Sequence, residues 1–138
     1  MAKFLTLNTH SWMEDEQEKK LDQLAERILQ EKYDVICLQE VNQEMESEQV
    51  VQAPFYHAVD GAIAIHKDHF AHCLVERLIE KGLIYHWSWA YNHIGFDRFH
   101  EGVAILSLNP LKPRELLVSD ANDPTDYHTR KVLLAETE

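Results

Sequence analysis

The chain has 138 residues, 45% of them hydrophobic, which is typical of a single globular domain. Its formal net charge is −11, from 24 acidic and 13 basic residues. Proteins that bind nucleic acid nonspecifically usually present a basic surface, and the longest basic runs here are Lys19-Lys20 and Arg130-Lys131. The charge therefore argues against nonspecific nucleic-acid binding by these residues.

Two features bear on where the protein works. No segment approaches the roughly 20 consecutive apolar residues that span a bilayer, and the N-terminus lacks the apolar stretch of a secretory signal. We therefore expect a cytoplasmic protein. The two cysteines, Cys37 and Cys73, do not support a disulfide framework. Cys37 lies in an apolar run, which predicts a buried thiol.

The first three elements predict a βαβ unit. A strand is expected over residues 3–7, an amphipathic helix over about 15–31, and a second strand, apolar on both faces, over 35–38. A strand of that kind is covered on both sides, as in a parallel pair flanked by helices, and its crossover is right-handed in nearly all known cases. Asn8 and Glu40 then lie at the carboxyl ends of neighbouring strands, the edge at which open α/β sheets bind ligands.

The middle of the chain predicts a loop followed by a second helix. Residues 42–66 are rich in acidic side chains and interrupted by Pro54 and Gly61, so we expect mostly loop. An amphipathic helix is expected over 68–81, with Asp68 as its N-cap and Gly82 just past its end.

The rest of the chain is predicted to be rich in β-structure. Residues 84–91 alternate in character, with every second position aromatic, which is typical of a strand. Further strands are expected over 103–106, 115–118 and 131–138, with loops over 92–100 and 120–126.

Glu40 and Asn8 are the first candidates for chemistry. A carboxylate at the end of one strand and an amide at the end of its neighbour offer the oxygen ligands that Mg²⁺ prefers, and Mg²⁺ needs only one or two carboxylates from the protein. The alternative is structural, with Glu40 opening a loop and Asn8 capping a turn. Spacing alone leaves both interpretations open.

Four short strings occur in order along the chain: LTLNTH at 5–10, DVICLQE at 34–40, HEGVAILS at 100–107 and TRKVL at 129–133. Together they resemble the opening half of the endonuclease/exonuclease/phosphatase superfamily, which includes exonuclease III, pancreatic deoxyribonuclease, neutral sphingomyelinases and inositol-polyphosphate phosphatases. The resemblance implies an α/β (α+β) fold, the N-terminal half of a four-layer αββα sandwich of the deoxyribonuclease-like type. Residues 1–138 would then be a single partial domain.

The resemblance also implies roles for individual residues. Asn8 and Glu40 match the asparagine and glutamate that help to build the family's metal site, which implies Mg²⁺, with Mn²⁺ as the alternative. Glu101 resembles the acidic residue that orients a catalytic histidine in the deoxyribonuclease branch, and we expect that histidine to come from outside this chain. Arg130 resembles the basic residue that approaches the substrate phosphate. His93, which has no counterpart in these motifs, is added as a third candidate catalytic residue beside Glu101 and Arg130.

Proteins of this superfamily look nearly twice as long as this chain. Their second half carries an Asp-x-Asn after a glycine, an Asp-His near the C-terminus and another histidine after a strand, and none of these has a counterpart here. By this analogy the general base, the water-orienting carboxylate and a phosphate-binding histidine are supplied by that half. We therefore expect the chain to be a truncation or one half of a larger protein.

Two further strings resemble one particular branch of this superfamily. NTHSWM at 8–13, and YHWSW at 85–89 followed by NHIGFD at 92–97, resemble cytoplasmic sugar-phosphate phosphatases of Gram-positive bacteria, of the maltose 6′-phosphate phosphatase type. Aromatic rings suit the C–H faces of sugars. The alternative, favoured for Trp87 and Trp89, is that they fill the core.

A run of histidines offers a rival metal site. His66, His69 and His72, followed by Cys73, have a spacing that places three imidazoles on one broad helical face, where two of them could bind zinc or nickel. Cys73 adjoins the buried stripe, and the sequence has no second ligand pair, so a structural role is favoured. Better site candidates are His10, His93 and His100, although for each of them a structural or surface role is the favoured alternative.

We expect metal-assisted hydrolysis of a phosphomonoester, most specifically a sugar phosphate, by the full-length protein, with this chain inactive alone. One alternative is a nuclease or phosphodiesterase of the same superfamily. Another is a non-catalytic fragment or binding module that another chain completes, which predicts an exposed apolar face and self-association as a homodimer. The expected partner is a small phosphorylated substrate, with nucleic acid disfavoured and no membrane contact.

Overall fold

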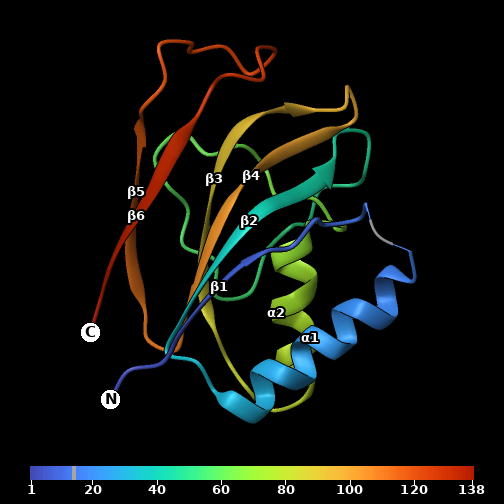
Figure 1. The fold of residues 1–138 in the computed structure, drawn as a ribbon, viewed down its shortest axis with the longest axis vertical. Coiled ribbons are helices and arrows are strands. Elements are labelled where there is room, and N and C mark those ends of the chain that lie inside the picture. The colour runs from blue at the N-terminus through green and yellow to red at the C-terminus, as the bar shows by residue number, and fades with distance from the viewer. Residues whose placement is uncertain (14) are drawn as a thin grey trace.

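The computed structural model describes residues 1–13 and 15–138, which fold into a four-stranded sheet with helices on one face and a two-stranded hairpin on the other (Figure 1). The strands of the sheet are, in spatial order, β1 (Phe4–Asn8), β2 (Val35–Glu44), β4 (Phe99–Ser107) and β3 (His86–Gly95). The helices are α1 (Gln17–Glu31) and α2 (Phe70–Glu80), and the hairpin joins β5 (Leu111–Leu117) to β6 (Lys131–Thr137).

The predicted βαβ unit is confirmed. β1 pairs with β2 in parallel, and Asn8 at the end of β1 is the register partner of Gln39. β2 continues past this point to Glu44, so Glu40 lies within the strand and not, as the sequence predicted, at its end. β4 pairs antiparallel with both β2 and β3. The sheet is therefore mixed, as expected of an α/β (α+β) fold.

The main core lies between the sheet and the two helices. It is formed by apolar side chains of α1, α2 and one face of the sheet, among them Leu21, Ile28, Leu74, Leu78, Ile36 and Leu38. Trp87 and Trp89 belong to this core and are 0% and 1% exposed. Their indole N–H groups donate to the backbone carbonyls of Pro54 and Val41. These tryptophans therefore fill the core, and they are too deeply buried to stack on a sugar.

The start of α2 differs from the prediction by two residues. The helix is capped by His69, whose ring accepts a hydrogen bond from the backbone N–H of His72 at 3.3 Å. Asp68, the predicted cap, instead accepts from the backbone N–H of Glu44 at 2.8 Å and so ties the helix start to β2. Gly82 follows the helix with φ 87, the left-handed conformation that glycine adopts without strain.

The strands are longer than predicted on both sides of the expected loop at 92–100. β3 continues to Gly95 and β4 begins at Phe99, so the loop is a tight hairpin turn. Phe96 and Asp97 have φ of 54 and 53, and Arg98 N–H donates to the Gly95 carbonyl at 3.1 Å. These are the features of a type I′ turn, whose usual Asn-Gly signal this sequence lacks. The prediction was wrong for that reason.

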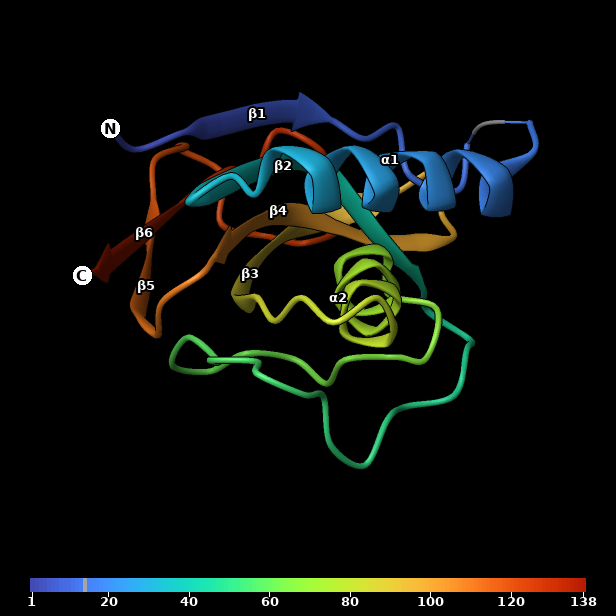
Figure 2. The same cartoon turned by 90° about the horizontal axis from the view of Figure 1, so that it is seen from below.

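The long connection after β2 passes around α2 and along the β3 edge (Figure 2). Its residues 55–57 hydrogen-bond with the backbone of Trp87: His57 N–H donates to the Trp87 carbonyl at 2.8 Å, and Trp87 N–H donates to the Phe55 carbonyl at 3.0 Å. The outer edge of β3 is thereby covered.

The second face of the sheet is only half covered. The β5–β6 hairpin packs against β3 and β4, where Leu133 joins a small buried cluster with Val59 and Ala90. On β1, Phe4 remains 70% exposed. Cys37 on β2 is half-buried rather than buried, and its burial raises the pKa of the thiol.

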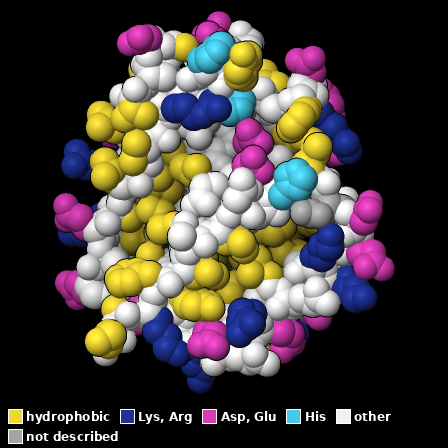
Figure 3. Space-filling view, in the orientation of Figure 1, with side chains coloured by type: hydrophobic (Ala, Val, Ile, Leu, Met, Phe, Trp, Pro, Cys, Tyr) yellow, Lys and Arg dark blue, Asp and Glu magenta, His cyan; other side chains and the backbone are white. Residues whose placement is uncertain are grey.

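The outer face of the hairpin is also apolar and exposed. Leu116 and Val132 are cross-strand partners on it and are 55% and 41% exposed, with Val118 nearby at 56%. Figure 3 shows hydrophobic side chains gathered over the hairpin and over the lower part of the sheet. Within residues 1–13 and 15–138, neither helix has the length and apolar composition that crossing a membrane requires.

Candidate active site

Four of the five predicted site residues lie on four adjacent strands. In the spatial order of the sheet they are Asn8 at the end of β1, Glu40 in β2, Glu101 in β4 and His93 in β3. Because neighbouring strands lie about 4.8 Å apart, the row crosses roughly 15 Å of sheet. Arg130, the fifth, immediately precedes β6 and contacts the His93 end of the row.

A β-bulge in β2 places Glu40. The pairing with β4 is regular up to Leu38 and resumes at Val41. Two residues of β2, Gln39 and Glu40, therefore lie opposite a single residue of β4. Glu40 takes the left-handed conformation, with φ 54. Such a conformation costs about 1–2 kcal/mol for a residue with a side chain. Strained backbone of this kind is concentrated at functional sites.

Asn8 and Glu40 are joined through the backbone between them. Thr9 N–H donates to the Gln39 carbonyl at 3.0 Å, and the Thr9 hydroxyl lies 3.0 Å from the carbonyl oxygens of both Gln39 and Glu40. The Asn8 side-chain oxygen accepts from the backbone N–H of His10 at 3.0 Å. The two predicted metal ligands, Asn8 at the end of β1 and Glu40 within β2, are therefore on neighbouring strands that hydrogen bonds hold together.

The close approach of β3 and β4 beside this bulge requires Gly102. A Cβ atom on Gly102 would lie 2.1 Å from the Ala90 carbonyl oxygen and 2.8 Å from Nε1 of Trp89. The same Nε1 donates to the Val41 carbonyl at 3.2 Å, directly after the bulge. Sequence reasoning missed the roles of Thr9 and Gly102, although both adjoin motif residues.

A second bulge, in β3, places His93. Tyr91 pairs with Gly102 and His93 pairs with Glu101, which leaves Asn92 as an extra residue. The side-chain oxygen of Asn92 accepts from the backbone N–H of Lys131 at 2.6 Å. The bulge therefore docks β3 onto the start of β6.

Glu101, His93 and Arg130 form one chain of contacts. Nε2 of His93 lies 3.0 Å from Oε2 of Glu101, and Nδ1 of His93 lies 3.0 Å from Nη1 of Arg130. A guanidinium can only donate, so Nδ1 must accept and the imidazole proton is on Nε2, donated to Glu101. The side chains of His93 and Glu101 are 8% and 18% exposed. We expected Glu101 to orient a histidine from outside the chain, and here its histidine partner is His93.

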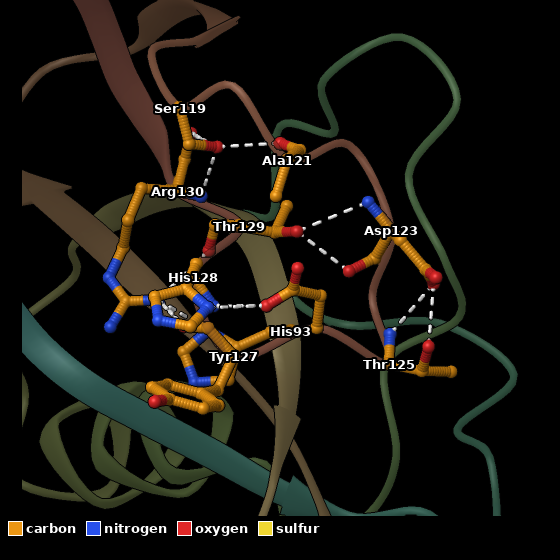
Figure 4. Close-up of polar contacts among 10 residues, drawn as sticks. His93, Ser119, Ala121, Asp123, Thr125, Tyr127, His128, Thr129 and Arg130 are labelled. Atoms are coloured by element: carbon orange, nitrogen blue, oxygen red, sulfur yellow. Dashed lines mark hydrogen bonds and ion pairs between the residues drawn. The ribbon is translucent and has the colours of Figure 1, made fainter.

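The loop before β6 fixes the backbone of Arg130 (Figure 4). Arg130 N–H donates to the Ser119 hydroxyl at 2.8 Å, and Nη1 also donates to the carbonyls of Tyr127 and Thr129. Thr129 is 1% exposed, and its hydroxyl donates to the Asp123 carbonyl at 2.6 Å. Arg130 itself is exposed, so the guanidinium is oriented and accessible.

The histidine run does not form a metal site in the described part of the chain, where no group of three or more His, Cys, Asp or Glu side chains could hold a metal ion. His66 instead bonds to the Ser47 hydroxyl at 3.0 Å, and His72 lies 3.1 Å from Glu76. His69 is fully buried, and desolvation, with the nearby histidines, holds its pKa well below the usual value. The structural interpretation fits these contacts.

His10 adjoins the Asn8 end of the row, whereas His100 lies apart from it. His10 is exposed on the segment after β1. Nδ1 of His100 lies 3.0 Å from the Gln43 amide, and its ring packs edge-on against Tyr91 at 5.1 Å, on the helix side of the sheet. Burial lowers the pKa of His100.

Comparison with known proteins identifies relatives of this arrangement. The chain matches the model of the endonuclease/exonuclease/phosphatase family over residues 12–137. A solved structure of an endonuclease/exonuclease/phosphatase family protein from Leptotrichia buccalis C-1013-b is 30% identical, with a TM-score of 0.87 over 100% of this chain and 49% of that one. No match was found among curated proteins.

A second solved structure shares the fold at lower identity. It is the endonuclease/exonuclease/phosphatase from Beutenbergia cavernae DSM 12333, at 17% identity and a TM-score of 0.60 over 97% of this chain and 33% of that one. The chain thus spans about half the length of the first relative and a third of the second.

Proposed function

The chain belongs to the endonuclease/exonuclease/phosphatase family, and from this membership we propose that it is the metal-binding half of a phosphoester hydrolase. The observation that carries the proposal is the row formed by Asn8, Glu40, Glu101 and His93 across four strands, with Arg130 at its end. The row combines oxygen ligands for a cation at one end with an oriented guanidinium for an anion at the other.

The ligand set suits Mg²⁺. This ion binds oxygen atoms, keeps several waters and takes one or two carboxylates from a protein. Glu40 supplies a carboxylate and Asn8 an amide oxygen with a second lone pair beyond the one that His10 N–H uses. Mn²⁺ accepts the same ligands. When bound, such an ion neutralises charge on the phosphoryl oxygens as the leaving group departs.

Arg130 is the proposed phosphate ligand. Within residues 1–13 and 15–138, the guanidinium contacts that we find all involve Nη1, so Nη2 and Nε remain for a phosphate oxygen pair. His93 and Glu101 orient the guanidinium. The Glu101 carboxylate accepts a hydrogen bond from Nε2 of His93, and Nδ1 of His93 accepts a hydrogen bond from Nη1 of Arg130. Phosphoryl transfer depends chiefly on positioning and charge neutralisation, which this chain of contacts provides.

A cytoplasmic sugar-phosphate monoesterase is the most specific form of the proposal. The net charge of −11 disfavours a long polyanion such as nucleic acid more than a small phosphorylated substrate. The strings at 8–13 and 92–97 that resemble sugar-phosphate phosphatases supply residues of the row, Asn8 and His93. The aromatic strand does not add support, because Trp87 and Trp89 are buried.

The metal site can be tested on the chain itself by titrating Mn²⁺ and following the free ion by electron paramagnetic resonance. We expect one saturable site that Glu40→Gln weakens at least tenfold. Glu46→Gln is the matched control, because Glu46 is an exposed acid of the loop after β2. Equal affinities for wild type and Glu40→Gln would reject the assignment.

The reaction itself can be tested in a protein that contains the complete domain. Phosphate release from sugar monophosphates, compared with hydrolysis of bis(p-nitrophenyl) phosphate and of DNA, separates a monoesterase from a nuclease. Glu40→Gln should reduce turnover by orders of magnitude while leaving the fold intact. Near-normal turnover in that variant, or faster hydrolysis of DNA than of sugar phosphates, would contradict the proposal.

A second candidate function is that of a half-domain that associates through its apolar surfaces. It is favoured by the exposure of Leu116, Val118 and Val132 on the outside of the hairpin and of Phe4 on the uncovered part of the sheet. Groups of exposed apolar side chains, such as those on the hairpin, mark interaction sites. A homodimer, in which each copy covers the other's open face, is the form we propose for the isolated chain.

A further inference from the structure

We propose that two hydroxyl groups after β1, those of Thr9 and Ser11, clamp the bulge in β2 and so set the direction of the Glu40 carboxylate. The inference deepens the proposed function, on which it rests only for what the carboxylate binds. Both residues belong to the segment that crosses from the end of β1 to α1. They act as positioning residues, since neither is needed as a ligand.

The contacts of the Thr9 hydroxyl depend on the left-handed conformation of Glu40. Successive carbonyl groups of an extended strand point to opposite sides, so one hydroxyl cannot reach two of them in a row. Here the Thr9 Oγ1 atom lies 3.0 Å from the carbonyl oxygens of both Gln39 and Glu40. The two carbonyls converge because Glu40 has φ 54. The shared hydrogen bond therefore favours the strained conformation over an extended one.

Ser11 holds β2 on the other side of Glu40. Its hydroxyl oxygen accepts from the backbone N–H of Asn42 at 3.0 Å, and the Asn42 amide donates to the Ser11 carbonyl at 3.5 Å. Ser11 and Asn42 are each 1% exposed, so water does not compete with these bonds. Three backbone groups are thus held by these hydroxyls: the carbonyls of Gln39 and Glu40 and the N–H of Asn42.

The clamp can be tested with Thr9→Val, which removes the hydroxyl and keeps the shape of the side chain. Thr9→Ser restores the hydroxyl, and Ser11→Ala removes the second contact. Thr6→Val is the matched control: it removes a β1 hydroxyl that accepts from the Gln39 side chain, without touching the Glu40 carbonyl. Far-UV circular dichroism and urea denaturation establish that each variant is folded.

Two measurements decide the outcome. Three-bond NMR couplings report φ of Glu40, and Mn²⁺ titration reports the affinity of the site. Thr9→Val should move Glu40 out of the left-handed region and weaken Mn²⁺ binding roughly tenfold, the lower end of the effect of removing a group that orients a metal ligand. Thr9→Ser and Thr6→Val should remain within about threefold of wild type. Ser11→Ala should act in the same direction as Thr9→Val, which keeps the test open if Thr9→Val does not fold.

The failure of the clamp and the failure of the metal site are distinguishable. An unchanged φ in folded Thr9→Val or Ser11→Ala rejects the clamp, whatever the ion does. A changed φ with unchanged Mn²⁺ affinity also rejects it, provided that Glu40→Gln weakens binding. If Glu40→Gln and wild type bind Mn²⁺ equally, the metal assignment fails, and φ of Glu40 alone decides whether the hydroxyls hold the bulge.

Discussion

Nε2 of His93 lies 3.0 Å from Oε2 of Glu101 on the adjacent strand, and this pairing together with Arg130 fixes the tautomer of the imidazole. Long-range ¹H–¹⁵N spectra should show the proton of His93 on Nε2 and none on Nδ1. In Arg130→Met the carboxylate of Glu101 still accepts from Nε2, so the proton should stay on Nε2, while the ¹⁵N shift of Nδ1 should change because Nδ1 has lost its donor. Lys131→Met is the control, because Lys131 contacts Glu115 instead. A wild-type spectrum with the proton on Nδ1 would contradict the proposed chain of contacts.

Replacing Gly102 should damage the fold beside the bulge. In Gly102→Ala the new methyl group would overlap the Ala90 carbonyl oxygen and crowd the Trp89 indole, both in the packed interior. We expect a loss of about 3 kcal/mol in the free energy of unfolding, the upper part of the range for overpacking. Urea denaturation measures it.

Gly95→Ala is the control for that loss. The atoms nearest to a Cβ at Gly95 would be those of Glu101, at an ordinary 3.5 Å. The change should cost well under half as much as Gly102→Ala. Equal effects of the two substitutions would show that the close approach at Gly102 is not what destabilises the chain.

The sequence predicted the layers of the molecule because their signals are periodic. The apolar stripe of α1 and the continuous apolar run at 35–38 indicate a parallel pair covered on both faces. The structure confirms the parallel pairing and the helix-side cover, whereas Phe4 on the other face is exposed. The turn at Phe96 and Asp97 escaped prediction because phenylalanine is rare at positive φ and no Asn-Gly or Asp-Gly pair marks the turn. Periodicity therefore predicted where the strands lie but did not predict all of their ends correctly.

The arrangement of the site depends on the two bulges, which carry no periodic signal. Residue type and order indicated Asn8 and Glu40, but nothing in the sequence shows that Glu40 is left-handed. Glu101 and His93 are eight positions apart, and only the register of the β3–β4 hairpin with its extra residue makes them neighbours. Whether these residues bind metal and phosphate stays a prediction.

Acid should destabilise the fold through His69. Its Nε2 is buried without a hydrogen-bond partner in the described residues, and its ring packs against Trp87 and Trp89 at 5.2 and 4.6 Å. Desolvation lowers its pKa well below the ordinary 6.5, so between those two values the unfolded chain binds a proton that the folded chain does not. Stability is therefore full above about pH 6.5 and falls progressively as the pH drops below it.

Urea denaturation at pH 7.5 and 5.5 measures this dependence. His69→Asn keeps a side-chain oxygen for the helix cap and removes the titrating group, so the difference between the two pH values should shrink. Burial also lowers the pKa of His72 and His100, and part of the difference should remain. A dependence that persists in full in His69→Asn would assign it to other groups.

The exposed apolar surface of the hairpin should make the isolated chain self-associate. Leu116 and Val132 face outward as cross-strand partners, and burying them against a second copy removes apolar area from water. Sedimentation at micromolar concentration should show a dimer, and Leu116→Lys should shift it to monomer because a charge at the centre of the contact is costly to bury. Val51→Lys is the control, since Val51 is a fully exposed loop residue. A monomeric wild type, or equal dimerisation of both lysine variants, would show that this surface does not join copies of the chain.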